Sequence, residues 1–86
     1  MKFNFTGKTA LVTGAGAGIG KAVSIMFAQN GAKVVLVDVD TEKLESVKKE
    51  IQEYTEDVIA VKCDIGNKAE IDDAVKKAEE AFGGVD

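Results

Sequence analysis

Four glycines lie within seven residues near the start of the chain, at positions 14, 16, 18 and 20. An apolar run over residues 9–12 precedes them and an amphipathic run over residues 19–29 follows, which predicts a strand, a tight turn and a helix. Glycine lets a backbone turn sharply and lie close to a bulky group. Because the first turn of a helix carries unpaired N–H groups and partial positive charge, the pattern indicates a phosphate-binding site.

Two phosphate-binding motifs can be compared with this stretch. The P-loop, G-x-x-x-x-G-K followed by Ser or Thr, matches Gly20 and Lys21 at its end. Ala15 replaces its first glycine, however, and Ala22 replaces the hydroxyl that binds magnesium, which disfavours phosphoryl transfer. The strict dinucleotide pattern G-x-G-x-x-G also fails, because position 19 is not glycine. The spacing that fits is T-G-x-x-x-G-x-G, beginning at Thr13, and a tight turn without a ligand is the alternative interpretation.

An acidic residue ends the next apolar run. Residues 33–37 read K-V-V-L-V, and Asp38 follows them, 18 residues after Gly20 and 24 after Gly14. A carboxylate at the end of a second strand, roughly 20 residues after a glycine turn, can accept both ribose hydroxyls of an adenosine. The alternative is an acid on the surface near the start of a helix. The glycine turn, the strand and the acid together favour a nucleotide site.

The composition narrows the class of protein and its partners. The chain has 86 residues, 45% apolar and 30% charged, which is typical of one small soluble domain. Its net charge is −4 and it has no basic cluster, so we expect no nucleic-acid partner. No apolar run approaches the length of a membrane span, and no secretory signal follows Lys2, so we expect a cytoplasmic protein. Cys63 is the single cysteine, and its strand-like surroundings predict buried packing.

The elements that would position the site alternate between strand and helix. We expect strands at residues 8–13, 33–38 and 58–63, and helices at residues 18–30, from Asp40 or Thr41 onward, and at residues 68–82. Such alternation predicts an α/β fold, a Rossmann-like three-layer βαβαβα unit with a parallel sheet in the order 3-2-1. The unbroken valine and leucine run of the second strand predicts burial on both faces.

Each expected helix carries apolar residues at helical spacing. The first has Ile19, Ala22, Val23, Met26 and Phe27, the second has Leu44, Val47, Ile51 and Tyr54, and the third has Ile71, Ala74, Val75, Ala78 and Phe82. We expect these stripes to face the sheet.

The chain resembles the short-chain dehydrogenase/reductase family over its whole length, from G-K-T-A-L-V-T-G at residues 7–14 to F-G-G-V-D at residues 82–86. The resemblance implies that the glycine turn, braced by Thr13, lines the pyrophosphate of a dinucleotide, and that Asp38 holds the adenosine ribose. The cofactor-binding residues that it implies are Gly14, Gly16, Ala17, Gly18, Ile19, Gly20, Asp38, Asp64 and Ile65.

Asp64 and Ile65 follow the third expected strand. The resemblance implies that they flank the adenine and that Asp64 meets its amino group. A helix-capping turn, which Asp64 and Asn67 would also suit, is the alternative.

The sequence also favours NAD over NADP. NADP would add a 2′-phosphate where the Asp38 carboxylate points, and two like charges that close are unfavourable. NADP-preferring relatives in the family tend to carry a basic residue in the glycine turn or after the second strand, where this chain has Ala17 and Val39.

The family's catalytic residues have no counterpart here. Its full domain is roughly three times longer, and its Ser, Tyr and Lys lie beyond residue 86; a fourth strand would follow directly. Tyr54 is no substitute, because the family's Tyr has Lys four residues later, where this chain has Val58. No acid–base pair and no metal cluster can be nominated.

Three hypotheses follow from these residues. The first is the amino-terminal, NAD-binding portion of an oxidoreductase that interconverts an alcohol and a ketone in its full-length form, by resemblance. The second is a stand-alone nucleotide-binding module without catalysis, natural or engineered, and the third is a structural fragment. In each case the first strand would be an open apolar edge, so we expect a homo-oligomer or a complex with the remainder of the fold.

Overall fold

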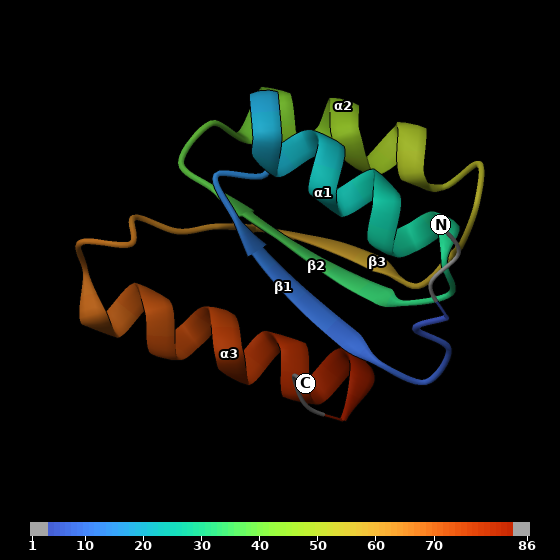
Figure 1. Cartoon of the computed structure of the whole chain (residues 1–86). Coiled ribbons are helices and arrows are strands. Elements are labelled where there is room, and N and C mark those ends of the chain that lie inside the picture. Colours follow the sequence, from blue (N-terminus) through green and yellow to red (C-terminus); the bar gives the residue numbers. More distant parts are fainter. Residues whose placement is uncertain (1–3, 84–86) are drawn as a thin grey trace.

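The computed structural model describes residues 4–83, in which three strands and three helices alternate along the chain (Figure 1). They are, in order, β1 (Thr9–Thr13), α1 (Gly18–Gln29), β2 (Lys33–Asp38), α2 (Thr41–Ile51), β3 (Val58–Lys62) and α3 (Lys68–Phe82). The strands form one parallel sheet in the order β1-β2-β3. Helices α1 and α2 cover one face and α3 covers the other. The predicted α/β class, the Rossmann-like arrangement and the strand order are therefore confirmed.

Strand β2 is the centre of the sheet and is buried on both faces. It pairs with β1, where Lys33 lies opposite Thr9, and with β3, where Val34 lies opposite Val58. Val34 and Leu36 pack on the side of α1 and α2, while alternate residues pack on the side of α3. This alternation is the period of a strand, and it confirms the prediction from the continuous apolar run.

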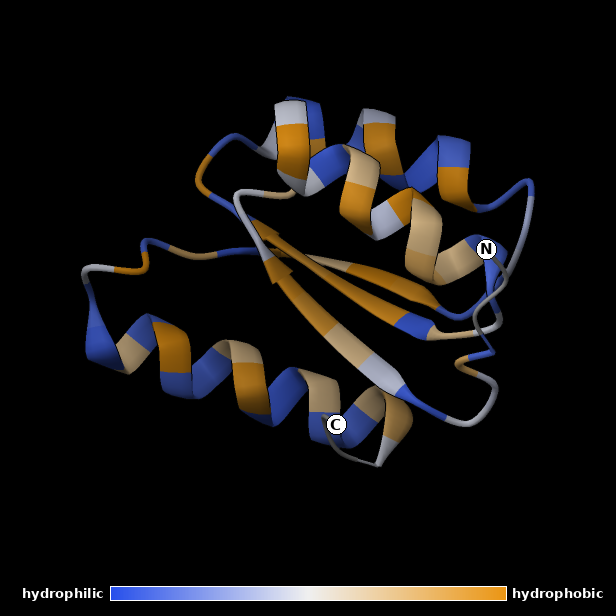
Figure 2. Cartoon of the chain, viewed as in Figure 1, coloured by the Kyte–Doolittle hydropathy of each residue, from blue (hydrophilic) through white to orange (hydrophobic). Residues whose placement is uncertain are grey.

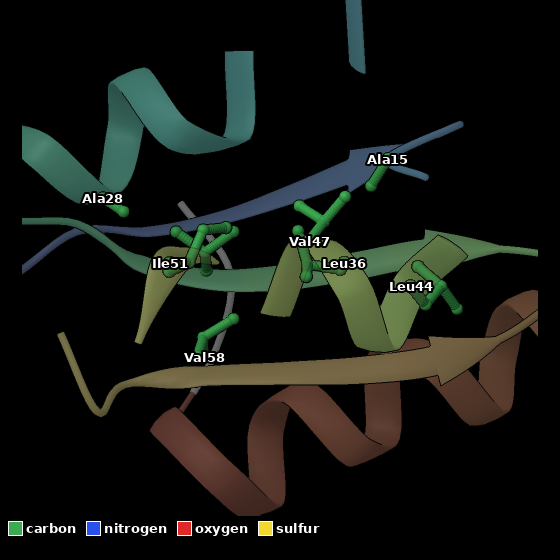
Figure 3. Close-up of a cluster of buried hydrophobic side chains, with 8 residues drawn as sticks. Ala15, Ala28, Leu36, Leu44, Val47, Ile51 and Val58 are labelled. Carbon is green, nitrogen blue, oxygen red and sulfur yellow. The ribbon is translucent and has the colours of Figure 1, made fainter. Parts of the chain in front are cut away.

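Two apolar clusters hold the layers together. Figure 3 shows the first, in which α2 and the end of α1 pack on the sheet. The second lies between the sheet and α3 and contains Val35, Val37, Val61, Cys63, Ala74 and Ala78. Figure 2 shows the same division by hydropathy: the strands are mostly hydrophobic, and hydrophobic and hydrophilic segments alternate along the helices. Helices therefore cover both faces of the sheet, and the ends of its strands remain available for a ligand site.

Helix α1 packs by only part of the predicted stripe: Phe27 packs against the first cluster, and Ile19 does not. Its buried residues are Ser24 and Ala28, whereas Ile19 is 83% exposed and Ala22 is exposed too. The helix lies so close to the glycine turn that a Cβ on Gly20 would collide with the carbonyl of the residue that opens the turn. Small residues four apart permit this approach, and the Ser24 hydroxyl is satisfied by donating to the Gly20 carbonyl at 2.7 Å.

The second helix is shorter than its predicted stripe. α2 ends at Ile51, and Tyr54, which the stripe included, lies in the following turn with 52% of its surface exposed. The amides of Tyr54 and Thr55 both donate to the Ile51 carbonyl, at 2.8 and 3.0 Å, which reverses the chain toward β3. Leu44, Val47 and Ile51 are buried as predicted.

Other boundaries shift by one residue. β1 begins at Thr9 rather than at position 8, α1 ends at Gln29 with Asn30 as its cap, and β3 ends at Lys62. Cys63 nevertheless continues the ladder, because its amide donates to the Asp38 carbonyl at 3.0 Å. The caps of α2 and α3 are Asp40 and Asn67, and α3 ends at a left-handed glycine as expected, whose neighbour at position 84 lies outside the described residues.

Candidate functional site

The carboxyl ends of the three strands meet at one edge of the sheet, where parallel α/β folds place their ligands. A hollow of about 200 Å³ lies there, walled by residues that follow all three strands. Its lining residues are Gly14, Val37, Asp38, Val39, Cys63, Asp64 and Ile65. Four of the nine residues predicted to bind a cofactor thus surround one cavity, and the other five lie in the glycine turn and the first turn of α1.

The glycine turn is tied to both neighbours. Gly14 has a φ of +63°, which lets the chain leave β1 and turn back toward α1. The amide of Ala15 donates to the Val37 carbonyl at 3.1 Å, and the Ala15 side chain is fully buried. These contacts fix the turn against β2, so that its next residues face the end of that strand.

Asp38 is the polar centre of the site. Its Oδ2 atom accepts a hydrogen bond from the Gly16 amide at 2.9 Å, and its Oδ1 atom accepts from the amides of Val39 at 2.7 Å and Asp40 at 3.2 Å. The Gly16 hydrogen bond is the largest cause that lowers the pKa of the Asp38 carboxyl, with smaller contributions from the other two amides and the positive charge of Lys43; partial desolvation opposes them. The group is therefore a carboxylate at neutral pH.

This bonding pattern limits what Asp38 can still accept. Two amides occupy the acceptor positions of Oδ1, and one amide occupies half of those of Oδ2. One further donor can approach Oδ2 without displacing a protein contact. A ribose hydroxyl that binds Asp38 could use this remaining position on Oδ2, and any further donor would share an oxygen with one of the three amides.

The N-terminus of α1 has no side-chain cap. Ala17 occupies the N-cap position in an extended conformation, and the first turn, Gly18, Ile19 and Gly20, contains no acidic residue. The amides of this turn therefore have no side-chain partner within residues 4–83, and no acidic residue of the turn itself offsets their partial positive charge. Ile19, at 83% exposure, is the most exposed large apolar residue of the described chain.

The segment after β3 contains both a helix cap and part of the wall of the hollow. Asn67 caps α3, because its Oδ1 atom accepts from the amides of Ala69 at 3.0 Å and Glu70 at 3.2 Å. Asp64 closes the preceding turn by accepting from the Gly66 amide through Oδ1 at 2.8 Å. Its Oδ2 atom accepts no hydrogen bond within residues 4–83 and is available to a ligand. The capping alternative thus holds for Asn67, while Asp64 also lines the hollow.

A second hollow of about 200 Å³ adjoins the first and is apolar. It lies between β1 and α3 and shares Val37, Cys63 and Ile65 with the first hollow. Cys63 is 2% exposed, and burial, together with the nearby carboxylates of Glu70, Asp64 and Asp73, raises the pKa of its thiol. The cysteine therefore packs as predicted and has little thiolate character.

Sequence reasoning missed some of these features. The bond between Gly16 and Asp38 joins residues 22 apart and depends on the turn's path, which the spacing of the glycines does not specify. Val37 and Cys63 wall the hollow because each stands at the end of a strand, a signal that the predicted strand ends already contained. No group of acidic, histidine or cysteine side chains that could hold a metal ion occurs among residues 4–83, and no helix in that range is long and apolar enough to cross a membrane.

Comparisons with known proteins agree with this geometry. The family model for short chain dehydrogenases matches residues 8–86. An uncharacterized oxidoreductase of Staphylococcus aureus strain USA300 is 43% identical over 81 residues, which cover 94% of this chain and 34% of that relative. The chain thus spans about a third of the length of the curated relatives it matches.

Solved structures show the same likeness. A short-chain dehydrogenase/reductase from Burkholderia phymatum in complex with NAD superposes with a TM-score of 0.91 at 40% identity, over 96% of this chain and 30% of that one. A 3-ketoacyl-(acyl-carrier-protein) reductase from Brucella melitensis complexed with NADH superposes with a TM-score of 0.89 at 44% identity, over 96% and 33%. The glycine turn, the strand order and these relatives show that the chain belongs to the short-chain dehydrogenase/reductase family. It matches the amino-terminal portion of the proteins of that family.

Proposed function

We propose that the chain forms the NAD-binding portion of an oxidoreductase that interconverts an alcohol and a ketone by hydride transfer. The observation that carries this proposal is the Asp38 carboxylate, which lies at the mouth of a hollow between strand ends and is bonded to the glycine turn. A turn without a ligand would not need an ionised carboxylate that is bonded to it through the Gly16 amide and oriented by the amides of Val39 and Asp40. The residues present fit the adenosine half of a dinucleotide.

The parts of the nucleotide would be shared among three segments. The adenine would lie in the hollow beside Ile65, with its amino group near the unpaired Oδ2 of Asp64. The ribose would donate one hydroxyl to Asp38. The pyrophosphate would lie at the uncapped amides of α1, and Ile19 would lose exposed apolar surface under the cofactor. When bound, the nicotinamide ring would supply the hydride acceptor or donor, and the role of these residues is to bind and orient it.

The proposed cofactor is NAD rather than NADP. The ionised Asp38 stands where a 2′-phosphate would add two negative charges, and its pKa, lowered by the Gly16 amide, keeps it ionised throughout the neutral range. Position 17 is alanine and position 39 is valine, so neither offers a counter-charge. The two solved relatives that carry NAD and NADH support this choice.

The 86-residue chain by itself is proposed to be inactive. The only tyrosine in the sequence, Tyr54, lies in the turn that leads into β3, at the amino end of the sheet, whereas the hollow lies at the carboxyl end. Incubation of the purified chain with NAD and a panel of secondary alcohols should give no NADH above the blank. Steady NADH formation would contradict this part of the proposal.

The carboxyl-terminal part of the edge strand β1 and the apolar hollow beside it are the proposed contact surface for the remainder of the fold or for a second copy. Leu11 on β1 is partly buried, and Ile71 and Val75 on α3 remain 38% and 37% exposed. A strand at a sheet edge presents backbone groups to another strand, and apolar surface beside it adds to the gain from pairing. Sedimentation at micromolar concentration tests the second-copy form, which a concentration-independent monomer would contradict.

An NMR titration of backbone amides tests the binding function directly. With AMP, we expect shifts at residues 14–20, at Asp38 and Val39, and at Asp64 and Ile65, with a dissociation constant in roughly the high micromolar to millimolar range because only half a site is present. Nicotinamide mononucleotide, which lacks the adenosine, is the control and should shift the α1 amides alone. Saturating AMP with no shift at Asp38 would contradict the proposal.

A further inference from the structure

Lys43 occupies a helix position that local preference does not favour. It is the third residue of α2, which begins at Thr41, and its amide donates to the side chain of the N-cap residue Asp40 at 3.1 Å. At this position of a capped helix, Glu or Gln is preferred, because it can bond back to the cap amide. A lysine there also places positive charge at the positive end of the helix dipole, which is unfavourable. Residues that break a local rule are often explained by a nearby site.

The site near Lys43 is the one between Asp38 and the glycine turn. A Cβ added to Gly16 would lie 2.8 Å from the Lys43 Cβ and 2.9 Å from the Asp38 Oδ2. The Gly16 backbone is therefore pressed between the stem of the lysine and the carboxylate. The positive charge of Lys43 contributes to lowering the pKa of Asp38, so the two charges sense each other.

The ammonium group of Lys43 has no ion-pair partner within residues 4–83. The ion pairs among residues 4–83 join Lys21 to Glu50 and Lys77 to Asp73, and the Lys43 side chain is exposed. A long flexible stem with three donors at its end can reach an acceptor that enters beside Asp38. The chain thus already contains a cation beside its ribose carboxylate, although positions 17 and 39 offer none.

We propose that Lys43 is a specificity-determining residue of the ribose site, which attracts a 2′-phosphate and is opposed in this by Asp38. The inference rests on the proposed function, because it presumes that the adenosine ribose lies at Asp38. Lys43 would attract the 2′-phosphate of the ligand, and Asp38 would repel it. Cofactor preference is then set by the balance of one carboxylate and one ammonium, and removal of the carboxylate uncovers the ammonium.

The test compares three adenosine nucleotides with the purified chain by NMR titration. The probes are 5′-AMP, adenosine 2′,5′-bisphosphate and 5′-ADP, of which the last matches the bisphosphate in phosphate number but has no 2′ group. The variants are Asp38→Asn, Lys43→Met and the double variant. Lys49→Met is the matched control, because Lys49 is exposed on the same helix and lies six residues further along.

Four results are expected. The native chain binds 5′-AMP more tightly than the bisphosphate. Lys43→Met weakens the affinity for the bisphosphate by about five- to tenfold, because one charge-assisted contact to the 2′-phosphate is lost. The same variant changes the affinity for 5′-AMP by less than about twofold. Asp38→Asn shifts the ratio of the two affinities toward the bisphosphate by about tenfold or more, and Lys43→Met on that background cancels most of the shift. Lys49→Met leaves every ratio unchanged.

Other outcomes overturn the inference, and they separate it from the proposed function. If 5′-AMP binds and shifts Asp38 while Lys43→Met leaves the bisphosphate ratio unchanged in both backgrounds, the role of Lys43 is refuted and the adenosine site stands. An equal loss for the bisphosphate and for 5′-ADP shows a general charge effect and also refutes it. If no nucleotide shifts the glycine-turn amides of a folded chain, the proposed function fails, and this inference fails with it.

Discussion

The N-terminus of α1 differs from the N-termini of α2 and α3 in how its first amides are bonded. α2 and α3 start at Asp40 and Asn67, whose side chains accept from amides of the first turn. α1 starts at Ala17, which has no side-chain acceptor, and the glycine turn leads into it. A capping residue satisfies its helix in the unliganded protein, whereas α1 keeps its first amides for another acceptor. The difference distinguishes N-termini that stabilise the fold from the one that we propose binds the pyrophosphate.

The largest expected effect comes from removing the close approach that brings α1 to the turn. In Gly20→Ala, the new Cβ would collide with the Gly14 carbonyl, so α1 must move, at a cost of about 3 kcal/mol or more in the free energy of unfolding. Gly18→Val is the comparison variant: no atom lies within 4 Å of its Cβ, but its φ is +59°, so we expect a loss of about 1–2 kcal/mol from backbone strain. Urea denaturation of both variants measures this. Equal stability of Gly20→Ala and the native chain would mean that α1 does not lie against the turn.

The next effect concerns the carboxylate that faces the uncapped helix. Asp38→Ala should weaken 5′-AMP binding by about tenfold, because the proposed charge-assisted acceptor of the ribose hydroxyl is lost. An unchanged isotherm would remove Asp38 from the site.

The same residue predicts a pH dependence. Because the folded pKa of Asp38 is lowered from its ordinary value of 3.8, chiefly by the Gly16 amide, its contribution to stability is present above that value. That contribution is lost as the pH falls through the lowered folded value. Acid titration of the native chain should therefore lose more stability in this range than titration of Asp38→Asn. Identical acid limbs would contradict the three-amide arrangement.

A cap removed from α3 should affect the fold and not the ligand. Asn67→Ala deletes the acceptor of two amides and should cost about 1 kcal/mol in the free energy of unfolding. Its 5′-AMP affinity should stay within about twofold of the native value, because Asn67 is not among the residues that line the hollow. A large loss of affinity would indicate that the turn after β3 is positioned by the cap.

The smallest effect, and the sharpest contrast, comes from giving α1 the cap that it lacks. Ala17→Asp places an acceptor at a residue whose extended conformation already suits a cap, so stability should rise by about 0.5–1 kcal/mol. The same carboxylate would occupy the amides proposed for the pyrophosphate, so NAD binding should weaken. Ala17→Ser, a neutral cap, separates the hydrogen bond from the charge. A stabilised variant with undiminished NAD binding would show that the phosphates lie elsewhere.

The architecture followed from the sequence to within a residue at most boundaries, because a parallel βαβ unit leaves few choices. Continuous burial of β2 required its apolar run, and right-handed crossovers placed α1 and α2 on one face. The error at α1 arose because apolar periodicity does not indicate a close contact between a helix and a turn. Small residues such as Gly20 and Ser24 make that contact here, and Ile19 does not. The error at Tyr54 arose because helical spacing continues through a turn that has already ended the helix.

The candidate site was predictable in its residues and not in its bonding. Asp38, Asp64 and the turn glycines stood at strand ends, which sequence patterns locate well. The course of the turn determines which of its amides donates to Asp38. It also determines how closely Lys43 approaches Gly16. Such contacts are decided by tertiary packing, and local preference at Lys43 even argues for a different residue type.

The strand order has a consequence for how the chain acquires its structure during synthesis. Every pair of neighbouring strands is also consecutive in sequence, so no strand must wait for a distant partner. β1, α1 and β2 can associate once residue 38 has left the ribosome, after which β3 adds to the free edge of β2 and the later helices pack on the faces of the sheet. The glycine turn and Asp38 both lie in that first unit, so the proposed ribose contact would be assembled before the rest of the sheet. Pulse-labelling hydrogen exchange on nascent chains of increasing length would follow the order directly.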